Sequence, residues 1–158
     1  MLIDSTITKI DFLKRLGCEE CLHGFDTLLH HLIGTRDLLK QWGAEEYVQD
    51  AGLYHSVYGT EYFQPNLNVT RDQVREIIGT ESERLVDLFC CCQPPRAFTI
   101  TLMSSGKTKE DLLLIERAND EEIGGSRMMT IEEAYDLLTK RLSQGNQSNK
   151  RKSVRHRR

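Results

Sequence analysis

Apolar residues recur at steps of three and four along most of this chain, which is the spacing of a buried helix face. Clear stripes begin at Phe25, Leu85 and Ile131, and the pair Pro94-Pro95 follows the second stripe as a helix stop. Strand-like alternation occurs only over residues 98–103. A lone strand has no pairing partner, so we expect a helix or an extended connector there. The pattern therefore predicts an all-α fold with about six or seven helices.

Threonines mark the expected starts of four helices. Each stands three residues before a side chain that can reach back to the free backbone N–H groups, as in a capping box or its aspartate variant. The four pairs are Thr70 with Gln73, Thr80 with Glu83, Thr108 with Asp111, and Thr130 with Glu133.

Residues 51–61, with the sequence AGLYHSVYGTE, are predicted to form a buried helix that carries His55 in its middle. The small residues Ala51, Gly52 and Gly59 leave room on its apolar face for a close helix neighbour or a ligand. An imidazole on such a face is either a hydrogen-bonded core residue or part of a binding site.

Two further polar residues interrupt apolar helix faces. His31 has apolar neighbours at helical spacing, whereas the adjacent His30 shares a face with charged residues and is expected to face water. Asn119 stands four residues from Ile115 and four from Ile123, where an unpaired buried amide costs about 1–3 kcal/mol. Together with His55, these positions predict one shared polar pocket. The alternative is that each residue only ties helices or a loop in place.

Composition divides the 158 residues into an acidic body and a basic tail. From Lys150 onward, six of the nine residues are Lys or Arg, which leaves 15 basic against 24 acidic residues in the rest of the chain. We predict one helical domain over residues 1–142. Residues 143–158 have too few apolar side chains to offset their ordering entropy, so we predict a disordered tail.

Charge and hydropathy also bear on partners and location. The acidic body argues against a nucleic-acid-binding surface, whereas the basic tail suits nuclear import, weak RNA contact, an anionic membrane or plain solvation. No apolar run is long enough to span a bilayer, and the N-terminus lacks a secretory signal. We expect an intracellular protein, cytoplasmic by default, with nuclear import through the tail as an alternative.

The five cysteines are predicted to be reduced thiols, because their number is odd and no signal peptide precedes them. Cys18 and Cys21 have the two-residue spacing of a zinc knuckle, and His23 lies close by. A structural zinc site needs four ligands and usually a second spaced pair. Thiols that fill space in the core or at helix ends are therefore the favoured interpretation.

The chain resembles the HD-domain superfamily of metal-dependent phosphohydrolases. The resemblance is carried by His31, by the segment 51–56 with its His55-Ser56 pair, and by Ala118-Asn119. It is nearest to an uncharacterised HD-like family of unknown function that has His-Ser in place of His-Asp. The resemblance implies a helical bundle with a divalent-cation site at these positions and a phosphate-ester or nucleotide substrate.

Two residues depart from the HD pattern. Ser56 stands where the resemblance implies an aspartate, and so does Asn119. Both replacements remove an anionic oxygen, so Mg²⁺ or Mn²⁺ would bind poorly. Zinc or iron would still use two histidines but would need a third ligand, for which Glu61 and His23 are candidates.

Three functional hypotheses follow. In the first, His31 and His55 act with the pocket residues Ser56, Tyr58, Thr60 and Asn119 to bind a small molecule, with hydrolysis lost or altered. The second is an active metal-dependent hydrolase in which His31, His55 and Glu61 bind zinc or iron. In the third, the polar cluster only pins helices together in a scaffold or partner-binding domain. His31 and His55 are the candidate acid–base residues in either enzymatic case, because imidazole titrates near neutrality.

Overall fold

The computed structural model describes residues 5–24, 26–61, 63–124 and 139. The chain divides into two units, residues 1–127 and 128–158, and the helical bundle belongs to the first. The predicted cap at Thr130, the domain boundary at residue 142 and the basic tail lie outside the described residues.

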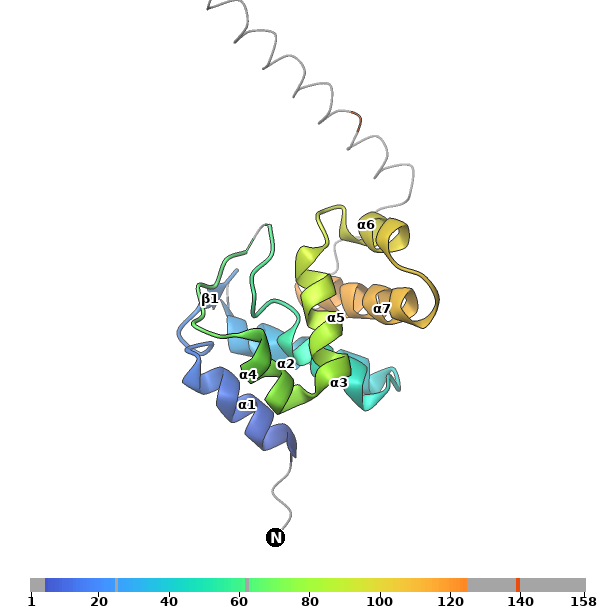
Figure 1. Cartoon of the computed structure of the whole chain (residues 1–158). Helices are drawn as coiled ribbons and strands as arrows, with labels where there is room; N and C mark the ends of the chain where they lie inside the picture. Colours follow the sequence, from blue (N-terminus) through green and yellow to red (C-terminus); the bar gives the residue numbers. More distant parts are fainter. Residues whose placement is uncertain (1–4, 25, 62, 125–138, 140–158) are drawn as a thin grey trace, which may run out of the picture. The chain divides into compact units, whose positions relative to one another are not determined.

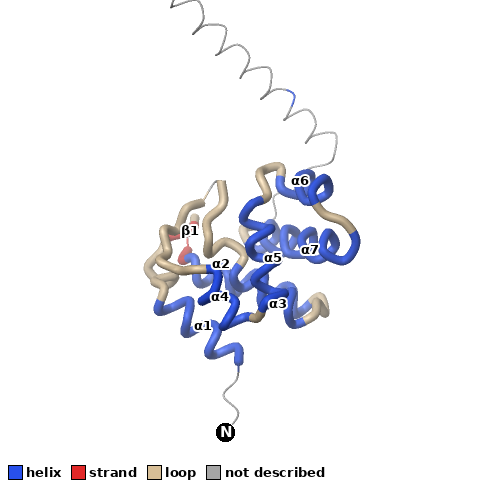
Figure 2. The backbone as a smooth tube through the Cα atoms, in the orientation of Figure 1, coloured by secondary structure: helices blue, strands red, loops and turns tan. Residues whose placement is uncertain are grey.

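Seven helices account for most of the described chain, which confirms the predicted all-α class (Figures 1 and 2). A two-residue hairpin, which the apolar pattern did not predict, precedes the second helix; its antiparallel strands pair Leu22 with Thr27 and His23 with Asp26. The elements in chain order are α1 (Ser5–Arg15), β1 (Leu22–His23), β2 (Asp26–Thr27), α2 (Leu28–Gln41), α3 (Glu46–Tyr54), α4 (Arg71–Ile78), α5 (Thr80–Cys91), α6 (Arg96–Met103) and α7 (Gly106–Glu122). In the described ranges, no helix combines the length and hydropathy that crossing a membrane requires.

Helices α2, α3, α5 and α7 form the centre of the bundle. Helix α2 packs against α3 and α7, while α3 also packs against α5 and α7. Their inward faces bury the large side chains Leu32, Leu53, Tyr54, Phe89 and Ile115 completely. The two longest of these helices, α2 and α7, therefore bring residues from the first and last thirds of the described chain together.

Of the three predicted helix caps that lie in the described residues, one is present. Thr70 and Gln73 form the complete capping box. Helix α5 instead begins after Gly79 without a side-chain cap, and α7 begins at Gly106, which places Thr108 inside its first turn. The predicted partners Glu83 and Asp111 are buried and accept hydrogen bonds from other helices. Tertiary contacts have thus replaced two expected local caps.

The predicted helix over residues 51–61 is wrong in its extent. Helix α3 ends at Tyr54, so His55 is its C-cap residue and not its middle. The Nδ1 atom of His55 lies 2.7 Å from the carbonyl oxygen of Gly52, which a continuing helix would have used for the backbone N–H of Ser56. Turns follow, and Gly59 adopts a positive φ of 84° that favours glycine. The side chain of His55 therefore helps to end its own helix.

Candidate functional site

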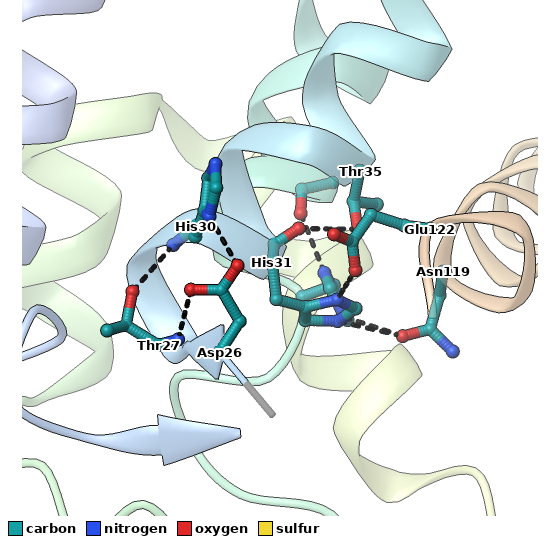
Figure 3. Close-up of polar contacts among 9 residues, drawn as sticks. Asp26, Thr27, His30, His31, Thr35, Asn119 and Glu122 are labelled. Carbon is teal, nitrogen blue, oxygen red and sulfur yellow. Dashed lines mark hydrogen bonds and ion pairs between the residues drawn. The ribbon is translucent and has the colours of Figure 1, made fainter. Parts of the chain in front are cut away.

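His31 is placed in the interior by the way helix α2 begins. Thr27 caps the helix by accepting a hydrogen bond from the backbone N–H of His30. Figure 3 shows the outcome: His30 turns toward Asp26 on the outside, while His31 points toward Asn119 and Glu122. The side chain of His31 is 2% exposed, which confirms the predicted choice of His31 over His30 as the inward-facing residue.

His55 is held at the end of α3 with its ring completely enclosed. Its Nδ1–H donates to the Gly52 carbonyl, and the edge of the ring contacts Phe89 with 5.3 Å between ring centroids. Burial, and then the neighbouring His31, lower the pKa of His55 to about 3. In the absence of a ligand, His55 is thus a neutral imidazole at physiological pH.

Three polar atoms converge between helices α2, α3 and α7. The Nε2 atoms of His31 and His55 are 3.1 Å apart, and the Oδ1 atom of Asn119 lies 3.1 Å from the first and 3.0 Å from the second. We call these three side chains the polar centre. The prediction that they share one location is met, although Asn119 is only partly buried.

In each histidine ring, the contact made by Nδ1 bears on whether Nε2, the nitrogen that faces the polar centre, carries a proton. The Nδ1 atom of His55 contacts a backbone carbonyl, which can only accept, so in the neutral ring the proton resides on Nδ1. The Nδ1 atom of His31 contacts the carboxylate of Glu122 in the same way. With both rings neutral, both Nε2 atoms present lone pairs, and the polar centre then consists of three acceptors.

Glu122 is a site residue that the sequence pattern did not reveal. It is the last residue of α7 and stands three residues after Asn119, on the same helix face. That spacing was the available signal, since a partner for one side of His31 had to come from the helix that carries Asn119. Glu122 also lies against Gly34, where a Cβ atom would be 2.7 Å from the Glu122 Cγ atom.

His23 covers the outer face of His31. The two rings stack with centroids 4.1 Å apart and planes inclined by 12°, and Phe63 contacts His23 edge-on. Burial, and then His31, lower the pKa of His23, which favours its neutral form. His23, on the hairpin strand β1, thus packs against the polar centre but is not one of its three acceptors.

The remaining predicted pocket residues have different environments. Ser56 is 3% exposed, and its Oγ atom is buried without a hydrogen-bond partner. Tyr58 donates to Glu83, at 3.0 Å. Tyr58, Thr60 and the exposed Glu61 line a separate open cavity of about 550 Å³, together with Arg71, Asp87 and Cys90 among others.

The cavity and the polar centre share one stretch of backbone. Cys90 lines the cavity, and its thiol donates to the carbonyl oxygen of His55, at 3.1 Å.

All five cysteines are free thiols, as predicted, and Cys18 is buried with its pKa raised to about 12, mainly by burial. Such a thiol stays protonated at neutral pH.

The spacing of the acceptors allows a direct test of metal fit. Among the described residues, no three histidine, cysteine, aspartate or glutamate side chains form a metal-binding group. Two ligands that bind one ion at about 2.1 Å and at right angles lie roughly 3.0 Å apart. The acceptors of the polar centre are separated by 3.0–3.1 Å. They fit one face of an octahedron, with two imidazoles and one amide as donors, whereas a tetrahedral zinc ion would require them to move apart to roughly 3.4 Å.

No curated protein and no solved structure matches this chain. Residues 12–94, just over half of the chain, match the family described as Domain of unknown function (DUF6817). The matched segment contains His31, His55 and Ser56, whereas Asn119 and Glu122 lie beyond it. The resemblance to a family of unknown function is confirmed at that level, and the relation to HD domains remains a prediction. The chain belongs to the DUF6817 family.

Proposed function

We propose that this protein is a diverged HD-like domain whose polar centre binds a transition-metal ion and, beside it, a small phosphate-ester or nucleotide ligand. Hydrolysis in this domain is lost or altered. The observation that carries the proposal is the convergence of three acceptor atoms within 3.0–3.1 Å of one another. The ligand class comes from the resemblance to HD domains alone.

Hydrogen bonds account poorly for this triangle. An N–H donor prefers an angle above 150° to its acceptor, so one proton aligns with only one edge of the triangle. Rotating the amide of Asn119 would place its NH₂ group toward the rings and serve one edge. With both rings neutral, the edge between His31 and His55 would still join two lone pairs. A cation located above the triangle satisfies all three acceptors together.

The donor set favours zinc or iron over magnesium. Imidazole nitrogen is a good ligand for transition metals, whereas Mg²⁺ prefers carboxylates and water oxygens. All three donors of the polar centre are neutral, so negative charge has to come from Glu122 through the ring of His31, and from the bound ligand. When bound, such an ion would polarise a phosphate oxygen or a water molecule on its open side.

The chain's own residues limit what chemistry is available. His55 is neutral and fully enclosed, so its role is to bind and orient. Glu61 is exposed and lines the separate cavity, and nothing in its position supports the hypothesis that it is the third metal ligand. Asn119 takes that place. It is also the partly exposed member of the polar centre, and therefore the side from which a ligand would approach.

Binding of zinc to protein purified without a histidine tag tests the proposal. We expect one equivalent bound by the wild type and binding at least about 100-fold weaker in His31→Ala, since one of three ligands is gone. His30→Ala is the matched control, because His30 is the neighbouring exposed histidine of the same helix. Thermal melting with inorganic phosphate and with a nucleoside monophosphate, in the presence of zinc, then tests the ligand.

The outcomes separate the three hypotheses. Zinc binding with a ligand-dependent rise in melting temperature, both lost in His31→Ala, supports the proposal. Hydrolysis of a phosphate ester by the wild type, with the activity lost in Glu61→Ala, would favour the active hydrolase. If neither zinc nor the phosphate compounds bind the wild type, the proposal is wrong and the scaffold hypothesis is favoured.

A further inference from the structure

We infer that Glu122 is a positioning residue that keeps the Nε2 atom of His31 free for a cation, and that Gly34 provides the space it occupies. The metal-affinity part of this inference rests on the proposed function. The part that concerns the protonation of His31 stands on the metal-free protein.

The contacts of Glu122 are specific to one nitrogen. Its carboxylate contacts the Nδ1 atom of His31 and is 24% exposed, so solvent only partly screens the interaction. A carboxylate accepts but does not donate, which keeps the proton of the neutral ring on Nδ1. The Nε2 atom is then directed at His55 and Asn119 as a lone pair.

Gly34 shapes this contact from the other side. It lies one turn after His31 on α2, and a Cβ atom there would stand 2.7 Å from the Glu122 Cγ atom and 2.9 Å from its Oε1 atom. The Cγ atom is close to the backbone of α7, so a rotation of the carboxylate alone does not relieve the overlap. A side chain at position 34 therefore requires the Glu122 side chain to shift, and we expect this shift to weaken its contact with His31.

Charge gives the arrangement a second effect. The three donors of the polar centre are neutral, and Glu122 is the anion that contacts one of them. A carboxylate on the outer nitrogen of a metal-binding histidine raises the basicity of the inner nitrogen, and its removal commonly weakens metal binding 10- to 100-fold. Because Asn119 and Glu122 occupy the same last turn of α7, that turn supplies both an acceptor and the compensating charge.

The first experiment compares Glu122→Ala and Glu122→Gln with Glu121→Ala, an exposed neighbour in the same turn. Nitrogen-15 NMR of the metal-free proteins reports which ring nitrogen of His31 carries the proton. We expect Nδ1–H in the wild type and in Glu121→Ala, and a loss of this preference in Glu122→Ala. Zinc affinity should fall 10- to 100-fold in Glu122→Ala and by a smaller factor in Glu122→Gln, which keeps an acceptor oxygen but not the charge.

The second experiment uses Gly34→Ala, which leaves every charge in place. Alanine is a better helix former than glycine, so a general loss of helix α2 is not expected. We expect the same change in the protonation of His31 and weaker zinc binding, in a protein that remains folded.

The two proposals fail in different ways. Wild-type protein that binds no zinc contradicts the proposed function, while the NMR comparison still decides the role of Glu122. Unchanged His31 protonation in both Glu122→Ala and Gly34→Ala would overturn the positioning role, whatever the metal affinity.

Discussion

Two buried polar clusters in this domain differ in how their donors and acceptors are matched. In the first, the carboxylate of Glu83 is 1% exposed and accepts hydrogen bonds from Tyr58, Arg71 and Arg75. In the second, the polar centre, three acceptors face one another. The comparison shows that burial of polar groups is not by itself a sign of function. The unmatched cluster is the one that we propose to bind a ligand.

The electrostatics of the two clusters differ accordingly. Burial raises the pKa of Glu83, but the hydrogen bonds from Arg71 and Tyr58 outweigh it, so the pKa is lowered overall. The anion is thereby stabilised inside the protein without any added group. Burial, and then the neighbouring His31, instead lower the pKa of His55, so its ring is held neutral.

Glu83→Gln tests most directly whether the Glu83 cluster and the polar centre are independent. This change removes the buried anion that accepts from Tyr58, Arg71 and Arg75, although Arg71 keeps Asp87 and Arg75 keeps Asp72 as ion-pair partners, so we expect a loss of about 2 kcal/mol in the free energy of unfolding. Zinc affinity should be unchanged. Urea denaturation and a zinc titration on the same protein check both, and a large loss of zinc binding would mean that the clusters are not independent.

A pH titration of stability in metal-free protein sharpens the comparison further. The folded pKa of His55 is about 3, below its ordinary 6.5, so the unfolded state binds more protons between these values. Stability should therefore fall with decreasing pH from about 6.5, by up to about 1.4 kcal/mol per pH unit. Glu83 also has a lowered pKa, but its contribution begins to be lost only below its ordinary value of 4.5.

Denaturation of His55→Gln and Glu83→Gln from pH 7 to pH 3 separates the two windows. His55→Gln should reduce the dependence that begins near pH 6.5 and leave the contribution of His23, whose pKa is also lowered, whereas Glu83→Gln should flatten only the more acidic part. Identical profiles for His55→Gln and wild type would show that His55 is protonated as easily in the folded state as in the unfolded chain.

The smallest expected change is a gain from Asn119→Asp. Adding one anionic oxygen to the polar centre should tighten zinc binding about fivefold, or roughly 1 kcal/mol, since affinity rises with ligand charge. Asn119→Leu is the control that removes the acceptor while keeping the size of the side chain. A zinc affinity that is equal in all three proteins would exclude position 119 from the ion's surroundings.

The residues of the polar centre could be predicted from sequence only in part. His31 and Asn119 interrupt apolar helix faces, which made them visible, and three such interruptions together with His55 predicted their common location. The sequence pattern did not predict where α3 ends, because the side chain of His55 takes the carbonyl oxygen of Gly52 as its hydrogen-bond acceptor. The spacing of apolar residues carries no information about such a contact. His31 and Glu122 are 91 positions apart in the sequence, which leaves no local pattern for their contact.

The same limit explains the errors in the fold. The spacing of Thr80 and Glu83 fits a capping box, but Glu83 instead accepts hydrogen bonds from arginines of the preceding helix. Its carboxylate is buried, and a buried ion pair stabilises it more than a cap at the surface would. The pairing of His23 with Asp26 in the hairpin involves strands of two residues each, which are too short for any alternation.

The most direct test of the central claim is a crystal structure of the wild-type protein with zinc, in which anomalous scattering locates the ion. We predict a single strong peak roughly 2.0–2.2 Å from the Nε2 atoms of His31 and His55 and from the Oδ1 atom of Asn119. A peak elsewhere, with the three side chains each bonded to a separate hydrogen donor, would contradict the account.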